Sequence, residues 1–153
     1  MNMHRRSFLS MTGTALAMAA TAALLPLRAL AQWVRPQAAF EAKGLEATFA
    51  AMGGTPEASP DITFMAPEIA ENGAVVPVNV TSKIPGTTEI SILVEMNPNP
   101  LAAIFVFPEG TEAAVQTRVK VAQTCKLHAV VRANGKLYGT SRETKVTLGG
   151  CGG

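Results

Sequence analysis

The feature that most constrains the fold is a change in the spacing of apolar residues near residue 60. Before that point, apolar residues recur at helical spacing, whereas beyond it they alternate with polar residues. The alternating part divides into about seven short runs bounded by turn residues, at the spacing of roughly 8–12 residues that is typical of an all-β sandwich. We expect strands at residues 61–65, 74–82, 88–96, 101–107, 115–121, 125–133 and 136–148.

Some of these strands carry signals of their place in the sheets. Pro77 cannot donate a hydrogen bond to a ladder, so strand 74–82 is expected at a sheet edge or beside a bulge. Asn134 and Gly135 favour a two-residue type I′ turn between the last two strands. Residues 104–107 are apolar on both faces, although a sandwich buries only one. Either the amino-terminal helix or another subunit must cover the second face, and we prefer the subunit.

An amino-terminal helical segment is expected over residues 32–54, joined to the strands by a polar linker at residues 55–60. Pro36 suits the first helical position, and Gly53 with Gly54 ends the helix. Gly44 weakens the interior without ending it in this prediction. The apolar stripe consists of Ala38, Ala42, Leu45, Phe49 and Met52.

The first 31 residues read as an export signal. Arg5 and Arg6 form a twin-arginine pattern ahead of a moderately apolar stretch, and Ala29-Leu30-Ala31 is a small-x-small cleavage site. The mature chain is therefore expected to start at Gln32 in the periplasm, exported by the twin-arginine route. The alternative is a membrane anchor, against which the length of the stretch and the cleavage site both argue.

The charge of the chain excludes one class of partner. Arg5, Arg6 and Arg28 account for three of the 13 Lys and Arg residues, and the same stretch holds no acid. The remaining basic residues therefore balance the 11 Asp and Glu residues to within one charge. A chain that is nearly neutral after signal removal is not expected to bind nucleic acid, and we expect no membrane contact once the signal is cleaved.

The carboxyl-terminal sequence Gly149-Gly150-Cys151-Gly152-Gly153 sets one thiol among four glycines. Glycine gives the backbone most freedom, so residues 149–153 are expected to form a thin, flexible arm. Three extended residues reach roughly 10 Å at ~3.4 Å each. A structural disulfide needs fixed geometry, which such an arm opposes. The terminal carboxylate and the lack of nearby Lys or Arg make Cys151 a poor nucleophile by itself.

The other chemically versatile residues form no catalytic constellation and no metal site. His128 is expected to point outward from its strand as a solvated surface residue. Cys125 shares the inward parity of Leu127 and is expected to be a small buried apolar residue, with a disulfide to Cys151 left open. The sequence therefore offers no catalytic residue, no metal ligand set and no cofactor.

The ending Val146-Thr147-Leu148-Gly149-Gly150-Cys151-Gly152-Gly153 resembles that of the SoxY family, the sulfur carriers of the periplasmic Sox thiosulfate-oxidising system. The resemblance covers nearly the whole chain, and the tail motif is its specific part. It implies an immunoglobulin-like antiparallel β-sandwich at residues 55–148, with an amino-terminal helix. Cys151 would be the covalent attachment site, and Gly149, Gly150, Gly152 and Gly153 would be the pivots of the arm.

The same resemblance implies a set of partners. A haem-containing SoxAX enzyme would join thiosulfate to Cys151, and a SoxB hydrolase would release sulfate, leaving a sulfane adduct. Other Sox components would oxidise that sulfane. A SoxZ-like subunit would be the stable heterodimer partner and would cross the membrane with this chain.

Two other functions compete with a covalent carrier. The chain could be an exported β-sandwich interaction protein whose terminal cysteine forms intermolecular disulfides. It could also be a thiol-active enzyme, although no base lies beside Cys151 in the sequence.

Overall fold

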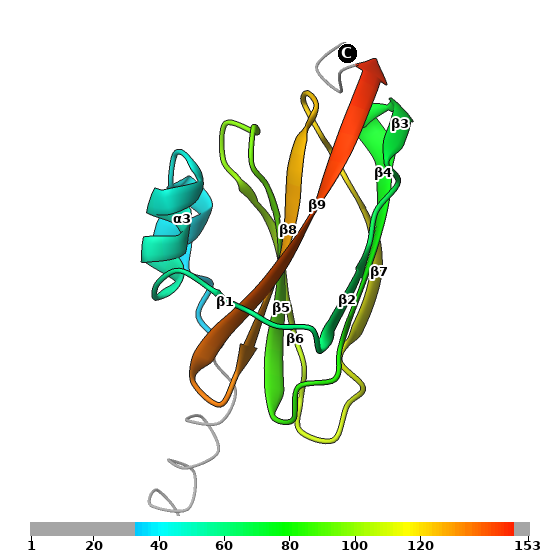
Figure 1. The fold of residues 1–153 in the computed structure, drawn as a ribbon. Helices are drawn as coiled ribbons and strands as arrows, with labels where there is room; N and C mark the ends of the chain where they lie inside the picture. The colour runs from blue at the N-terminus through cyan, green and yellow to red at the C-terminus, as the bar shows by residue number, and fades with distance from the viewer. Residues whose placement is uncertain (1–32, 149–153) are drawn as a thin grey trace, which may run out of the picture. The chain divides into compact units, whose positions relative to one another are not determined.

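The computed structural model describes residues 33–148, so the expected signal peptide (1–31) and glycine-rich arm (149–153) lie outside the described residues. From Pro36 onward, the described chain belongs to one compact unit. Two β-sheets pack face to face in it, and two short helices lie against the outer face of the larger sheet (Figure 1). The mainly β, immunoglobulin-like sandwich with an amino-terminal helical segment is thus confirmed.

Nine strands build the two sheets within the described residues. They are β1 (Glu57–Ala58), β2 (Ile62–Met65), β3 (Ile69–Asn72), β4 (Val76–Ser82), β5 (Thr87–Val94), β6 (Leu101–Val106), β7 (Ala114–Val119), β8 (Cys125–Ala133) and β9 (Lys136–Leu148). The larger sheet has the order β1-β9-β8-β5-β6, with β3 also paired to β9, and the smaller sheet has the order β2-β4-β7.

The core between the sheets follows from the alternation in the sequence. Ile90, Ile92 and Val94 of β5 point into it together with the inward residues of β8, and none of these side chains is exposed to solvent. The hairpin between β8 and β9 has positive φ at both Asn134 (51°) and Gly135 (75°), as a type I′ turn requires. The inward faces of β5 and β8 and the turn type therefore agree with the sequence predictions.

Two short strands were not predicted, and both pair in parallel with β9. In the expected linker, Glu57 and Ala58 pair with Tyr138 and Gly139. Between the expected strands 61–65 and 74–82, Ile69 pairs with Lys145 and Asn72 with Leu148. The 3₁₀ helix η1 (Gly73–Val75) follows directly after β3. These segments lack strand alternation because the exposed edge of β9 recruits their backbone, which requires no particular side chains.

The position of β4 corrects the prediction that the strand with Pro77 lies at a sheet edge. β4 is the central strand of the smaller sheet rather than an edge strand. β2, however, pairs with β4 only from Asn79 to Ser82, so it ends before reaching Pro77. The missing N–H of Pro77 is tolerated because β4 has a neighbour, β7, on one side only at that point.

The expected single helix is divided into α2 (Gln37–Glu41) and α3 (Leu45–Met52). Gly44 separates them with φ of 80°, which an α-helix cannot contain, so its effect was underestimated in the prediction. The break also moves the buried face, since Ala39 is buried and Ala38 is exposed. The helix end was predicted correctly, because Gly53 adopts the left-handed conformation as the C-cap of α3.

The outer face of the larger sheet is covered by these helices. Ala39, Met52, Leu93, Leu101 and Val130 form a second buried apolar cluster, which Ile104 borders. The helices therefore provide the cover that we had preferred to assign to another subunit, because Ile104 packs beneath them. Val106, at 46% exposure, and Ala102 are the exposed residues of this strand.

Candidate functional site

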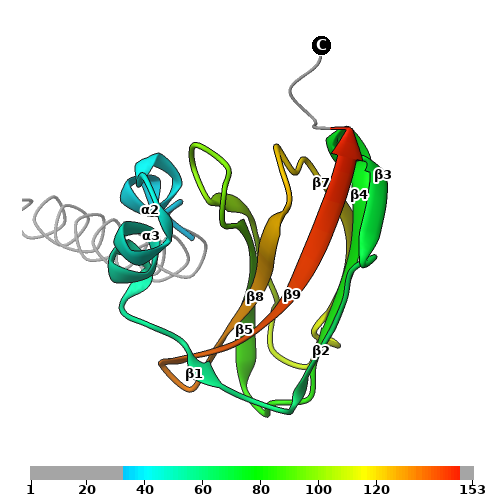
Figure 2. The same cartoon turned by 45° about the horizontal axis from the view of Figure 1, so that its top comes forward.

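β9 carries the chain from the centre of the larger sheet to the last described residue, Leu148. Its first part pairs with β8 as far as Thr144, which lies opposite Cys125. Beyond Thr144 it leaves β8 and pairs with β3 instead. Figure 2 shows the end of β9 beside β3 and β4, at the rim of the sandwich. Residues 149–153, which include the predicted attachment site Cys151 and its four glycines, continue from this rim and lie outside the described residues.

The last residues of β9 are held by hydrogen bonds on both sides of the strand. On the β3 side, the backbone N–H of Lys145 donates to the carbonyl of Glu68 (2.8 Å), and the Thr147 hydroxyl donates to the carbonyl of Glu71 (3.1 Å). On the other side, the Val146 N–H donates to the Thr124 hydroxyl oxygen (2.9 Å). The path of the chain is therefore determined up to Leu148 by its neighbours.

Cys125 is the one cysteine among the described residues, and it lies at the start of β8 in the core. Its thiol is free and buried, in agreement with its predicted inward parity. Burial raises the pKa of the Cys125 thiol above its ordinary value, and the nearby Glu95 carboxylate raises it further, although backbone hydrogen bonds oppose both. A thiol that resists ionisation and lies in the core is a poor nucleophile and metal ligand.

His128 corrects a second prediction, because it is not a solvated surface residue. Its parity is outward as expected, but α3 covers that face, and the His128 side chain is only 16% exposed. The ring of Phe49 lies edge-on to the imidazole, with 6.0 Å between ring centroids. Nε2 lies 3.6 Å from Oε2 of Glu95 and has no hydrogen-bond partner. Burial lowers the pKa of His128, and this effect exceeds the opposing attraction of Glu95.

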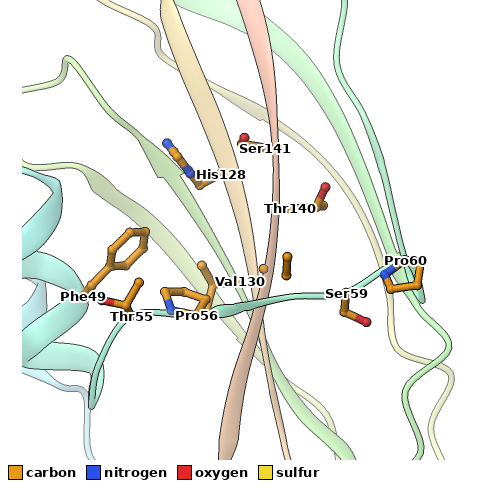
Figure 3. Close-up of a pocket in the computed structure, with 11 residues that line it drawn as sticks. Phe49, Thr55, Pro56, Ser59, Pro60, His128, Val130, Thr140 and Ser141 are labelled. Atoms are coloured by element: carbon orange, nitrogen blue, oxygen red, sulfur yellow. The ribbon is translucent and has the colours of Figure 1, made fainter.

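A pocket of about 460 Å³ lies beside this histidine, between α3, the chain that follows it, and the outer face of β8 and β9. Figure 3 shows its lining, which includes Phe49, Pro56, His128, Thr140 and Ser141. No Lys or Arg lines it, and Glu95 lies next to the histidine. A neutral imidazole beside a carboxylate suits a neutral polar group better than an anion. Strand parity alone could not have found the pocket, because the helix creates it.

No metal centre accompanies this pocket within residues 33–148. No group of three or more His, Cys, Asp or Glu side chains is close enough to hold a metal ion in that part of the chain. No helix among the described residues is long and apolar enough to cross a membrane.

The pocket beside His128 lies on β9 seven residues before Leu148, or roughly 23 Å at ~3.3 Å per residue. Cys151, at roughly 10 Å from Leu148 at most, cannot reach it within one chain.

Comparison with known proteins gives a family and a related structure. The family model of sulfur oxidation protein SoxY matches residues 48–151, a range that includes Cys151. The structure of the sulfur carrier protein SoxY from Chlorobium limicola f thiosulfatophilum is 44% identical. That match covers 71% of this chain and 96% of the other, with a TM-score of 0.62.

The human F-spondin reeler domain matches at 12% identity and a TM-score of 0.34, over 58% of this chain and 92% of that one. No curated protein matches the chain.

Proposed function

Because the chain belongs to the SoxY family of sulfur oxidation proteins, we propose that it carries sulfur intermediates of thiosulfate oxidation, bound covalently to Cys151. In this proposal, Gly149, Gly150, Gly152 and Gly153 form a flexible arm that presents the thiol to separate enzymes. The folded body carries and positions the arm and catalyses no step. The observation that carries the proposal is the family match, which extends through Cys151 and is accompanied by a 44% identical sulfur carrier.

The two cysteines of the chain support the choice of Cys151. Cys125 is enclosed in the core, and burial raises the pKa of its thiol, so it is unsuited to accept a substrate. No cation lines the pocket beside His128, and the Glu95 carboxylate lies 3.6 Å from that histidine, which is unfavourable for thiosulfate. The remaining cysteine lies three residues beyond the fixed end of β9.

The chemistry proposed for Cys151 is balanced as two steps. In the first, the Cys151 thiol and thiosulfate form an S–S bond, giving cysteine S-thiosulfonate, one proton and two electrons. The haem centres of a SoxAX enzyme accept the electrons. In the second, water attacks the terminal sulfur in a SoxB hydrolase, the S–SO₃ bond breaks, and sulfate and two protons leave. The cysteine persulfide anion that remains is the sulfane adduct for other Sox oxidation components.

The same proposal includes the setting of the protein. Cleavage after Ala31 would leave a mature periplasmic chain exported by the twin-arginine route, and a SoxZ-like subunit would form a heterodimer with it. The chain itself would need no cofactor, because the adduct on Cys151 is its cargo. The twin-arginine pattern and the family membership support these points.

The test uses the two cysteines as a matched pair in a reconstituted thiosulfate-oxidising system. Cys151→Ser should abolish turnover and leave the melting temperature unchanged, whereas Cys125→Ala should retain turnover. Full thiosulfate oxidation by Cys151→Ser would disprove the carrier role. If Cys151 instead serves as a cross-link, the wild-type chain should form only reducible dimers and no sulfur adduct.

A further inference from the structure

The loop between β5 and β6 contacts two parts of the molecule that are far apart in the sequence. Its last four residues are Asn97-Pro98-Asn99-Pro100, and both asparagine side chains are half-buried. Each proline fixes its own φ and restricts the residue before it to extended conformations. Both asparagines are therefore held in a narrow range of conformations. We call residues 95–100 the bridging loop.

On one side, Asn97 holds the connection between β7 and β8. Its Nδ2 donates to the Lys120 carbonyl (2.8 Å), and its Oδ1 accepts from the Ala122 N–H (3.0 Å). A side-chain amide has both donors and an acceptor, so Asn97 pairs with this stretch as a neighbouring strand would. The same connection ends in Thr124, whose hydroxyl oxygen accepts from the Val146 N–H (2.9 Å) of β9. Asn97 therefore supports the segment that holds the last part of β9.

On the other side, Asn99 holds the chain between α2 and α3. Its Nδ2 donates to the carbonyls of Phe40 (3.1 Å) and Ala42 (3.4 Å), and its Oδ1 accepts from Nζ of Lys43 (3.0 Å). Figure 1 and Figure 2 both show the bridging loop between the helices and the connection from β7 to β8.

These bonds differ from the usual ones of asparagine in a turn. An asparagine side chain commonly bonds to backbone groups within its own turn. The partners of Asn97 and Asn99 are instead 23 to 59 residues away in the sequence. The base of the loop is also closed, because the Val94 N–H donates to the carbonyl of the buried Pro100 (2.8 Å). A closed loop with two prolines has few conformations, as a rigid connection between two elements requires.

We propose that the bridging loop fixes the exit of the carrier arm relative to the helical segment. Asn97 is then a positioning residue for Cys151, and Asn99 anchors the loop to the helices. This inference rests on the proposed function. If the connection between β7 and β8 loosens, the end of β9 samples more positions, and an enzyme that binds the arm must first order it. The cost is weaker binding, whereas the chemistry of the bound adduct is unchanged.

Hydrogen exchange at the Val146 amide tests the structural part of this proposal. Asn97→Ala removes both bonds to the connection and should speed exchange of that amide by about tenfold, the size expected for the loss of two hydrogen bonds. Asn99→Ala should speed it by a smaller factor, because it releases the loop from the helices. The amide of Ile92 in the core should exchange as in the wild type in both variants.

Asn134→Gly is the matched control. It removes a similar side-chain bond, from Nδ2 to the Pro85 carbonyl (2.9 Å), in the turn that precedes β9, and glycine keeps the positive φ of that turn. This variant should leave Val146 exchange unchanged. The proposal is overturned if Val146 exchange in Asn99→Ala equals that of the wild type, or if the control speeds it as much as Asn97→Ala does. Equal acceleration at Ile92 and Val146 would also overturn it, since the effect would then be global.

Kinetics with purified SoxB test the link to function, on carriers that are loaded without any enzyme. Tetrathionate reacts with a thiolate to give cysteine S-thiosulfonate and release thiosulfate. Loaded Asn97→Ala should raise KM for sulfate release at least about threefold and leave kcat unchanged, while Asn134→Gly should match the wild type. A lower kcat with an unchanged KM would overturn the positioning role. A wild-type carrier that loads but releases no sulfate would count against the proposed function itself, on which the exchange rates do not depend.

Discussion

The two ends of the described chain are attached to the larger sheet in different ways. At the amino-terminal end, α2 and α3 cover the outer face of β8 and β5 through a buried apolar cluster, with Leu93 at 0% exposure beneath them. At the carboxyl-terminal end, β9 is held to β3 by backbone pairing and by hydroxyl groups, while Lys145 and Thr147 remain exposed.

The two attachments therefore have different roles, one in the stability of the fold and the other in directing the tail. Burial of apolar side chains is the dominant favourable term in folding, so the helix-covered face contributes to the stability of the unit. Hydrogen bonds exposed at a rim contribute little, but they fix direction. The end of β9 therefore determines where the tail leaves the body without adding much to the stability of the fold.

The largest expected effect is at the helix-covered face. Leu93→Ala should lower the free energy of unfolding by about 2–5 kcal/mol, because it empties a fully buried site. Thr147→Val, the matched change at the arm end, removes one exposed hydroxyl bond and should cost less than about 1 kcal/mol. Urea unfolding of both variants measures this difference, and similar costs at the two ends would contradict the comparison.

A smaller effect is expected where a polar group joins α3 to the sheet. Arg132 donates from Nε to Glu89 (2.8 Å) and from an amino group to the carbonyl of Met52 (2.8 Å). Arg132→Met keeps the aliphatic stem but removes both bonds, so we expect a loss of about 1–3 kcal/mol. Hydrogen exchange should show the loss first in the amides of α3. Unchanged protection of α3 would mean that the apolar cluster alone holds the helix.

The smallest effect is expected in how the stability of the fold depends on pH. The pKa of His128 is lowered on folding, so the unfolded chain binds a proton more readily below about pH 6.5. Stability should fall as pH falls through that value. Glu95 favours the charged imidazole and Lys126 disfavours it, and the Phe49 contact from α3 is uncharged.

A His128→Gln variant should lose less stability than the wild type between pH 7.5 and 5.5, as measured by urea unfolding at each pH. Parallel losses in the two proteins would show that His128 does not titrate differently on folding.

The parts of the fold that were predicted from sequence are those whose side chains have one buried face. Ile90, Ile92 and Val94 alternate because β5 lies between the sheets, and their pattern is visible without the structure. β1 and β3 were missed because they pair through backbone groups along β9 and carry no pattern. The break at Gly44 was missed because a glycine within a helical pattern can either weaken the helix or end it.

The candidate site likewise has features that could be predicted from the sequence and features that could not. The tail motif could be recognised from the sequence because it is contiguous, and Cys125 was placed in the core by parity alone. The surroundings of His128 depend on Phe49 and Glu95, which are distant in sequence and are brought together only by the fold. The surroundings of the end of β9 were missed for the same reason, since Ile69 and Thr124 meet β9 from opposite sides.

The most direct test of the carrier role is the mass of the intact mature protein after incubation with thiosulfate and the SoxAX enzyme. We predict that the wild type and Cys125→Ala each gain one thiosulfonate group that a reductant removes, and that Cys151→Ser gains none. An adduct that persists in Cys151→Ser, or one that disappears in Cys125→Ala, would contradict the assignment of Cys151 as the carrier thiol.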